Sequence, residues 1–351
     1  MNQQSIAING RKIGAGQPTY LVAELSANHR QDFAEAIRLV EAAKKAGADA
    51  IKLQTYTPET ITIDSDAPSF RIGGGTLWDG RTLYSLYGEA YTPWEWQPKL
   101  KAVANDLGLD LFSTPFDHTA VAFLEEMGVP AYKVASFEIV DLALIRHIAR
   151  TGRPMIISTG MASLAEIDEA VRTAREAGAT QIVLLKCTSA YPTPPVEMNL
   201  RTIPHLAQAF GLPAGLSDHT LGIAVPLAAV ALGACLVEKH FTLSRDIPSP
   251  DSAFSLEPHE FQAMVEAIRV VEKALGEVSY EVTEREAASR EFRRSLFVVQ
   301  DIKAGEAFTE QNVRCIRPGH GLHPRYLDQV SGRRAAQDIE RGTPLSWELI
   351  A

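Results

Sequence analysis

Short apolar runs alternate with longer segments of helical period along most of the chain. The runs are rich in apolar and β-branched residues, as strands buried on both faces are, and the segments repeat apolar residues every three or four positions. The pairs of a run and the segment that follows it are residues 19–26 and 33–47, 48–56 and 93–108, 109–115 and 119–128, 131–136 and 141–152, 154–160 and 163–178, 181–187 and 202–211, 214–219 and 220–234, and 235–241 and 257–276. This pattern predicts eight strands that alternate with eight helices.

Eight such units in a row predict an α/β fold of the closed parallel type, a (β/α)8 or TIM barrel, over residues 1–276. Several predicted helices end in glycine just before the next strand, for example Gly128 and Gly178, which is typical of helix C-caps. A doubly wound open sheet is the alternative. That fold usually has a glycine-rich phosphate turn after its first strand, and residues 24–32, ELSANHRQD, contain no glycine.

Both ends of the chain depart from this alternation of strands and helices. Residues 5–14 alternate apolar and polar side chains around Asn9-Gly10, which predicts a β-hairpin with a type I′ turn. Residues 277–294 are highly charged and have no apolar stripe, which indicates a solvated linker or a surface helix. Residues 295–351 change to short alternating runs with glycine turns, so we predict a small β-rich second domain with a marginal core of its own.

Composition narrows the class of protein. The chain has 351 residues, of which 46% are hydrophobic and 22% charged, and this composition excludes disordered and fibrous classes. Its net charge of −9 argues against nucleic acid as a partner. The first residues lack the apolar core of a secretion signal, and no run is long enough to span a membrane. Because the three cysteines are far apart, in apolar runs, we expect reduced thiols and a cytoplasmic protein without a membrane partner.

Polar side chains follow most of the predicted strands at the same end, which in a parallel barrel is the catalytic face. Buried charges without partners are heavily penalised, so a ring of such residues indicates a ligand that completes it. In strand order these residues are Glu24; Lys52 and Gln54; Ser113 and Thr114; Lys133, Ser136 and Glu138; Ser158 and Thr159; Lys186, Thr188 and Ser189; Ser217 and His219; Glu238 and His240. We therefore predict a binding site at the carboxyl ends of the strands.

The residue types in this ring indicate which ligands it binds. Lys52 and Lys133 offer positive charge, and four hydroxyls near them offer short donors, a combination that suits a phosphate or a phosphate with a carboxylate. The four hydroxyls belong to Thr114, Ser136, Ser158 and Ser217.

A second group of polar residues suits a metal ion. His219 and His240 end neighbouring strands, and two imidazoles suit a divalent metal ion whose other positions stay open for water or substrate. Glu24 and Asp251 supply carboxylates for acid and base chemistry.

Nine motifs along the chain resemble those of the sialic acid synthase family. They occur in the family's order and cover almost the whole chain: KLQTY, STPFD, YKVASFE, IISTGMA, KCTSAYPTP, MNLRTIP, GLSDHT, EKHF and RPGHGL. Enzymes of this family condense phosphoenolpyruvate with an N-acylated amino sugar to give a nonulosonic acid. The resemblance implies a (β/α)8 barrel followed by an antifreeze-like (SAF) domain, which agrees with the two parts predicted above.

Within the family the chain looks most like the pseudaminic acid synthases, whose acceptor is a 2,4-diacetamido-2,4,6-trideoxy sugar of L-altro configuration. The segments that carry this likeness are LYSLYGEAYTPWEW, PFDHTAVAFLEEMGVPAYKVASFEIVDLALI and DSAFSLEP. Two departures from the usual sialic acid synthase motifs agree with it: Ser189 stands where asparagine is usual in CTNxYP, and ELSANH replaces a GxNH motif. N-acetylneuraminate and legionaminate synthases are the alternatives.

The resemblance also implies roles for individual residues. The phosphoenolpyruvate ligands would be Lys52, Thr114, Lys133, Ser136, Ser158, Ser189 and Ser217. The acceptor sugar would contact Gln54, Glu138, Tyr191, Asp251 and Arg317. A divalent cation, Mn2+, Mg2+ or Co2+, would be bound by His219 and His240, with Glu24 handling protons. Because Arg317 belongs to the small domain, we expect a domain-swapped homodimer in which that domain of one chain caps the barrel of the other.

Two other classes of protein remain possible on these residues. A class I aldolase would form a Schiff base on Lys133 or Lys186. A non-catalytic sugar-binding or ice-binding module would use the terminal domain, although the polar ring of the barrel disfavours it. The glycine-rich residues 73–76, GGGT, lie in the long loop of about residues 57–92 and are interpreted as a lid or surface loop.

Overall fold

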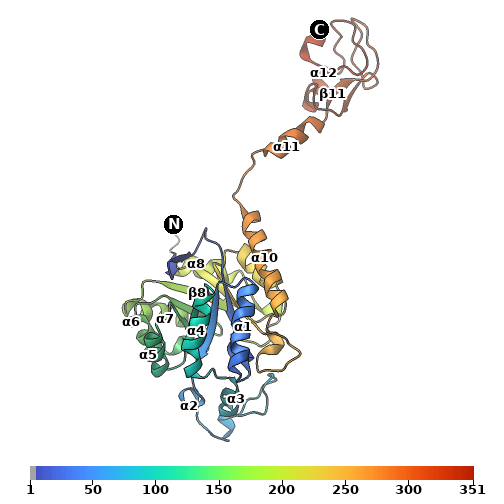
Figure 1. Ribbon diagram of the computed structural model, residues 1–351. Helices are drawn as coiled ribbons and strands as arrows, with labels where there is room; N and C mark the ends of the chain where they lie inside the picture. Colours follow the sequence, from blue (N-terminus) through green and yellow to red (C-terminus); the bar gives the residue numbers. More distant parts are fainter. Residues whose placement is uncertain (1–4) are drawn as a thin grey trace. The chain divides into compact units, whose positions relative to one another are not determined.

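Eight parallel strands close into a barrel in the computed structural model, which describes residues 5–351 (Figure 1). Around the barrel the strands are β3 (Tyr20–Glu24), β4 (Ala50–Thr55), β5 (Asp110–Pro115), β6 (Tyr132–Val134), β7 (Met155–Ser158), β8 (Ile182–Cys187), β9 (Ala214–Asp218) and β10 (Leu236–His240). Pairing of β10 with β3 closes the ring. The predicted (β/α)8 barrel is confirmed, and the doubly wound open sheet is wrong.

Helices follow the strands along the chain and surround the barrel (Figure 1). They are α1 (Phe33–Lys45), α4 (Gln97–Asp106), α5 (His118–Met127), α6 (Leu142–Arg150), α7 (Leu164–Glu176), α8 (Thr202–Phe210), α9 (Ala224–Ala231) and α10 (Pro258–Leu275). The predicted C-cap glycines take left-handed backbone angles, with φ of 67° at Gly128 and 107° at Gly178. One predicted helical segment, residues 220–234, is helical only from Ala224, because the chain bends first through Gly222, where φ is 72°.

Packing explains why the strands are apolar on both faces. Residues that point outward pack against the helices in two large clusters, and residues that point inward fill the barrel with Val22, Ala50, Phe112, Ile156 and Val183. The predicted N-terminal hairpin, β1 (Ile6–Ile8) with β2 (Arg11–Ile13), adds its isoleucines to this inner cluster.

The long connection between β4 and α4 contains two helices, α2 (Pro58–Ile61) and α3 (Leu83–Ala90). Shorter turns of 3-10 helix follow four of the other strands: η1 (Ser26–His29) after β3, η4 (Phe137–Val140) after β6, η5 (Pro195–Glu197) after β8 and η6 (Ser252–Phe254) after β10. These connections leave the carboxyl ends of the strands, so they surround the predicted site.

The chain divides into two compact units, Met1–Gly276 and Glu277–Ala351. The second unit begins with exposed residues 277–294, which include α11 (Glu284–Ser289). It continues with the antiparallel pair β11 (Ser295–Val298) and β12 (Val313–Ile316) and a short helix, α12 (Leu327–Val330). A small core of its own fills this unit, built from Leu296, Val298, Ile302, Phe308, Val313, Val330, Ala335, Ile339 and Leu345.

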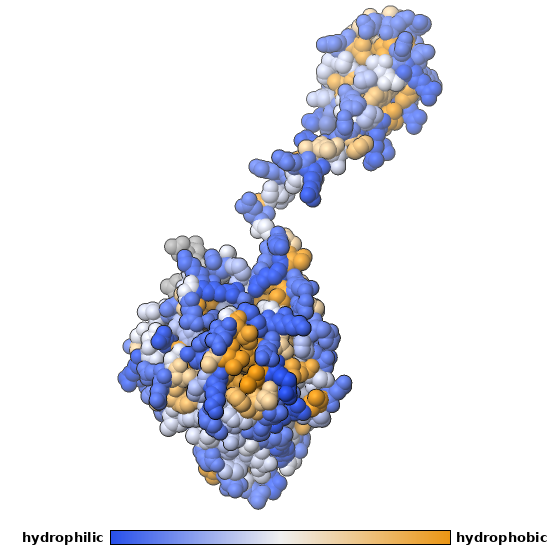
Figure 2. Space-filling view, in the orientation of Figure 1, coloured by the Kyte–Doolittle hydropathy of each residue, from blue (hydrophilic) through white to orange (hydrophobic). Residues whose placement is uncertain are grey.

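The surface of the barrel is mostly hydrophilic, as the globular composition of the chain predicts. Figure 2 shows a face covered largely by hydrophilic residues, with hydrophobic residues gathered in a patch among the outer helices. Among residues 5–351, no helix combines the length and the apolar character that a membrane crossing needs. The three cysteines, Cys187, Cys235 and Cys315, are free thiols.

Candidate active site

Two lysines and two glutamates form a buried cluster where β3, β4, β6 and β10 end. Lys52 Nζ forms an ion pair with Glu24 Oε2 and lies 3.4 Å from Glu238 Oε1, and Lys133 Nζ lies 3.6 Å from the same oxygen of Glu238. All four side chains are almost completely buried. Ladder pairing puts Lys52 beside Glu24, and the two-residue repeat of the strands turns these side chains inward.

Hydroxyl groups extend this cluster as the sequence predicts. Thr114 Oγ1 accepts a hydrogen bond from Lys52 Nζ at 3.4 Å, and Ser217 Oγ donates to Glu238 Oε1 at 3.1 Å. Glu238 thus contacts both lysines and Ser217. The sequence places it in the polar ring, two residues before His240 on the same face of the strand, but does not indicate which residues it contacts.

Burial and charge act against each other on the ionisable groups of this cluster. Burial lowers the pKa of Lys133, and the opposing pull of Glu238 does not restore it. Burial also lowers the pKa of Lys52, but Glu238 and Glu24 outweigh burial, so its pKa is raised. For Glu24, burial raises the pKa although Lys52 opposes it. Lys52 and Lys133 therefore already interact with buried carboxylates. An anion that binds to the two lysines would compete with Glu24 and Glu238 for their positive charge.

A second group of hydroxyls surrounds the turn after β7. The N–H of Gly160 donates to Ser136 Oγ at 3.1 Å, and a Cβ atom at this glycine would collide with the hydroxyls of Ser136 and Ser189. The turn therefore brings together two predicted phosphate ligands from β6 and β8. Ser158, at the end of β7, has a buried Oγ without a hydrogen-bond partner among the described residues. Buried polar atoms in this state usually have a ligand or water as partner.

The two histidines lie side by side, with 5.3 Å between their ring centroids. His219 Nδ1 lies 3.0 Å from the carbonyl oxygen of Thr188, so a proton on Nδ1 donates there and leaves Nε2 with a free lone pair. His240 Nδ1 is buried without a hydrogen-bond partner among the described residues, and 3.8 Å separates it from Asp251 Oδ2. Burial lowers the pKa of His240 well below its usual value, which keeps its imidazole neutral.

This arrangement fits a divalent cation with few protein ligands. The described residues contain no group of three His, Cys, Asp or Glu side chains that could hold a metal ion. Two imidazoles with available nitrogens, and the carboxylate of Asp251 beside one of them, would therefore leave most coordination positions to water and substrate.

Aromatic side chains pack around His219 and His240. Tyr191 packs against His219 with the rings tilted by 48° and their centroids 4.4 Å apart, and its ring centroid lies 5.2 Å from that of Phe254 and 5.6 Å from that of Trp78. Trp78 belongs to the long loop after β4, and its Nε1 donates to the carbonyl oxygen of Pro250 at 3.0 Å. The loop interpreted as a lid or surface loop therefore reaches the site through Trp78, a residue that sequence reasoning missed because nothing local indicates its contacts.

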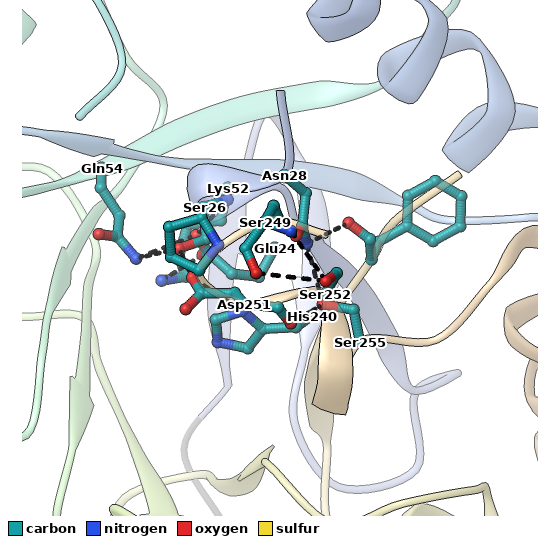
Figure 3. A network of polar contacts seen from close by, with 12 residues as sticks. Glu24, Ser26, Asn28, Lys52, Gln54, His240, Ser249, Asp251, Ser252 and Ser255 are labelled. Carbon is teal, nitrogen blue, oxygen red and sulfur yellow. Dashed lines mark hydrogen bonds and ion pairs between the residues drawn. The ribbon is translucent and has the colours of Figure 1, made fainter. Parts of the chain in front are cut away.

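A polar network joins the loops that follow β3 and β10 (Figure 3). Ser26 contacts Asp251 and accepts from Gln54 Nε2 at 2.9 Å. Asn28 Nδ2 donates to Ser255 Oγ at 2.9 Å. These bonds fix two predicted sugar ligands, Gln54 and Asp251, at one side of the histidines.

The other predicted sugar ligands lie apart from this network. Glu138, on η4, has a buried Oε2 without a hydrogen-bond partner among the described residues, and burial raises its pKa to about 7. Arg317 belongs to the second unit, where it lines a groove of about 810 Å³ together with Arg290 and His320.

Of the two lysines considered for a Schiff base, only Lys133 points into the barrel. Lys186 pairs with Leu216 on the outward face, and its Nζ donates to the carbonyl oxygen of Cys187 at 2.7 Å and to Thr188 Oγ1 at 3.0 Å. The inclusion of Lys186 as a possible Schiff-base lysine is therefore wrong, because a one-residue shift along a strand reverses the direction of the side chain.

Comparisons with known proteins agree with this geometry. The model of the NeuB family matches residues 39–280, and the SAF domain model matches residues 293–351. The pseudaminic acid synthase of Helicobacter pylori is 46% identical over 95% of this chain and 98% of its own length. The N,N'-diacetyllegionaminic acid synthase of Legionella pneumophila is 36% identical over 98% of both chains.

A solved structure shares the fold. The N-acetylneuraminic acid (sialic acid) synthetase of Leptospira borgpetersenii, solved in complex with citrate, matches with a TM-score of 0.73 and 32% identity. The match covers 82% of this chain and 95% of that one. The family resemblance predicted from the motifs is confirmed, and the chain belongs to the NeuB family.

Proposed function

We propose that the chain is a pseudaminic acid synthase. It condenses phosphoenolpyruvate with a 2,4-diacetamido-2,4,6-trideoxy-L-altrose and water to give pseudaminic acid and phosphate. The observation that carries the reaction class is the pair of inward lysines among hydroxyls at the end of the barrel. The higher identity to a pseudaminic acid synthase, 46% against 36% for a legionaminic acid synthase, supports this acceptor.

Phosphoenolpyruvate would occupy the space between the lysine cluster and the Gly160 turn. Lys52 and Lys133 would neutralise its phosphate and carboxylate, and Thr114, Ser136, Ser158, Ser189 and Ser217 would donate short hydrogen bonds. The unpartnered Oγ of Ser158 supports this, because a bound anion would satisfy it. Glu238 then has a defined task, since it holds both lysines near one another before the substrate arrives.

His219 and His240 would hold a divalent cation, Mn2+, Mg2+ or Co2+. The free imidazole nitrogens described above support this assignment. When bound, such a cation acts as a Lewis acid that polarises the carbonyl oxygen of the open-chain sugar. The residues of the chain orient the reactants and move protons.

Carbon–carbon bond formation joins C3 of phosphoenolpyruvate to the aldehyde carbon of the sugar, and the aldehyde oxygen takes up a proton. Water adds to C2 of the former enol phosphate and gives up a proton, and the C–O bond to phosphate breaks. Glu24 is our candidate for exchanging these protons, because it is buried beside Lys52 and Gln54 and burial raises its pKa above the usual value. Gln54, Glu138, Tyr191 and Asp251 would hold the sugar beside it.

The active enzyme would be a cytoplasmic homodimer that exchanges its second unit. Residues 277–294 expose apolar side chains, with Val278 91% and Tyr280 97% accessible, as expected of a segment covered by a partner. Arg317 of one chain would then contact an acyl group of the sugar in the other barrel. The cytoplasm supplies phosphoenolpyruvate and keeps the three free cysteines reduced.

Complementation tests the exchange. His240→Ala leaves the second unit intact and Arg317→Ala leaves the barrel intact, so each variant alone should be inactive. After co-refolding, about half of the dimers pair the two variants at random, and each mixed dimer would contain one complete site. Activity should return in the mixture. Mixed dimers that form but stay inactive would show that Arg317 serves its own barrel or none.

A product assay tests the function. The enzyme is incubated with phosphoenolpyruvate and, separately, with N-acetylmannosamine, the legionaminic precursor and the pseudaminic precursor. Phosphate release and product mass should show the highest kcat/KM with the pseudaminic precursor. A preference for either other sugar would assign the enzyme to that synthase. Borohydride trapping with pyruvate should give no adduct on Lys133, in contrast to a class I aldolase.

A further inference from the structure

Ser26 occupies a backbone conformation that favours glycine, although it is buried beside the site. It follows β3 by two residues, and its φ of 43° lies in the left-handed region. A non-glycine residue in this region is uncommon, and such strain persists only where surrounding interactions over-determine it. The interactions that hold Ser26 therefore indicate what its side chain does.

Ser26 forms hydrogen bonds with three polar side chains. Its Oγ donates a hydrogen bond to Asp251 Oδ2 and accepts one from Gln54 Nε2 at 2.9 Å (Figure 3). Its backbone N–H donates to Glu24 Oε1 at 2.9 Å. The hydroxyl thus links Gln54 at the end of β4 to Asp251 in the loop after β10. A glycine at this position would keep the backbone conformation but would lose both hydrogen bonds of the hydroxyl.

The Ser26 hydroxyl and Glu24 together determine which way the amide of Gln54 points, because the hydroxyl gives its proton to Asp251 and therefore faces Gln54 as an acceptor. Gln54 Nε2 lies 3.4 Å from Glu24 Oε1, an oxygen that already accepts the N–H of Ser26. The group of Gln54 that faces this acceptor must be its NH2, since an amide oxygen there would oppose a carboxyl oxygen. Gln54 Oε1 is therefore directed away from Ser26 and Glu24, as Figure 3 shows.

We propose that Ser26 is a positioning residue that makes Gln54 and Asp251 hydrogen-bond acceptors toward the acceptor sugar. Both NH2 hydrogens of Gln54 are engaged, and one oxygen of Asp251 is held by Ser26, so each side chain presents oxygen to a ligand. Acetamido N–H and hydroxyl O–H groups are the donors that match such oxygens. The inference rests on the proposed function for the sugar and adds the residue that orients its binding groups.

Two substitutions separate the hydroxyl from the backbone. Ser26→Ala removes the hydroxyl and keeps a Cβ in the left-handed region, whereas Ser26→Gly removes the hydroxyl and relieves the strain. Ser26→Gly should therefore melt at a higher temperature than Ser26→Ala. Both should raise the KM for the sugar about five- to twentyfold, the range of one lost hydrogen bond, with the KM for phosphoenolpyruvate changed less than about twofold.

A double-mutant cycle tests whether Ser26 acts through Gln54. In the Gln54→Ala background, Ser26→Ala should raise the sugar KM by a clearly smaller factor than it does in the wild type, because one of the two groups that it orients is gone and only Asp251 remains. Equal effects of Ser26→Ala with and without Gln54 would overturn the proposal, since they would indicate a general effect on the loop. The proposal would also be overturned if Ser26→Gly, the variant with the higher melting temperature, kept a sugar KM near the wild-type value while Ser26→Ala did not.

The outcome is distinguishable from failure of the proposed function. If wild-type enzyme does not convert the pseudaminic precursor but converts another sugar of the panel, the proposed acceptor is wrong and the cycle is measured with that sugar. If wild-type enzyme converts the pseudaminic precursor and both Ser26 variants keep its KM, only the role of Ser26 is wrong.

Discussion

Two sets of buried charges lie on β9 and β10 and face opposite sides of the barrel wall. Asp218 and Lys239 point outward toward the helices, whereas Ser217 and Glu238, their neighbours in sequence, point inward. In the outward set every charge is matched: Lys239 Nζ lies 2.5 Å from Asp218 Oδ2, and both the N–H and the hydroxyl of Thr220 donate to Asp218 at 3.0 Å.

The inward set on β10, and the buried polar groups of the candidate site on other elements, are incomplete by the same criterion. Glu238 Oε2, Ser158 Oγ, Glu138 Oε2 and His240 Nδ1 are buried without a hydrogen-bond partner among the described residues. Buried polar groups in this state are unfavourable unless a ligand or water completes them. The comparison teaches that burial of charge alone does not mark a functional site, whereas burial with open hydrogen-bonding capacity does.

The largest expected effect is loss of activity on removing a histidine from the inward set. His219→Ala or His240→Ala should abolish turnover while far-UV circular dichroism and melting temperature stay near wild type, because His219 directly follows β9 and His240 ends β10, both at the rim of the barrel. EDTA should abolish turnover of the wild-type enzyme, and Mn2+, Mg2+ or Co2+ should restore it. Full activity of metal-stripped enzyme would contradict the metal proposal.

Breaking the outward pair should affect stability instead. Lys239→Met leaves Asp218 buried without its partner, so the free energy of unfolding should fall by about 3–5 kcal/mol. Lys133→Met is the matched control on the inward side. Glu238 keeps Lys52 and Ser217 as partners after this change, so the loss of Lys133 should cost less than about 1 kcal/mol. Urea unfolding measures the free energy of unfolding of both variants. Equal decreases in the two variants would contradict the distinction between the outward and inward sets.

Substitution of either lysine of the phosphoenolpyruvate site should change the KM for that substrate far more than the KM for the sugar. Lys52→Met or Lys133→Met should raise the KM for phosphoenolpyruvate about ten- to a hundredfold, because a hydrogen bond to a charged group is worth about 1.5–3 kcal/mol. The KM for the sugar should change much less. Steady-state kinetics with each substrate varied in turn checks this, and similar changes in both values would argue against the assignment.

The smallest expected effect concerns pH and Glu138. Burial raises its pKa from an ordinary 4.5 to about 7, so the folded state holds a proton that the unfolded state has lost between these values. Its contribution is fully present below pH 4.5 and is lost as the pH rises through 7, a change of about 1–3 kcal/mol. Relative to wild type, Glu138→Gln should therefore gain stability as the pH rises across this window. Parallel stability curves for the two proteins would contradict the assignment.

Much of the fold could be predicted because it depends on local pattern. Period-two and period-3.6 repeats identified the strands and helices of the barrel, and Asn9-Gly10 identified the hairpin. The candidate site was also accessible in outline, because parallel strands bring their carboxyl ends together and the polar residues at those ends therefore meet. Lys52, Thr114 and Ser217 lie in the predicted cluster for this reason.

The sequence by itself determined the barrel, its catalytic end and the residue types gathered there, because strand periodicity and parallel closure leave few alternatives. Only the tertiary structure decided which contacts form. It turned Lys186 outward, placed Glu238 between two lysines, brought Trp78 of a long loop onto Tyr191, and held Ser26 in a left-handed conformation between Gln54 and Asp251. The reason is physical: side-chain direction at strand ends and in loops depends on register and on partners far away in the chain, which no local pattern encodes.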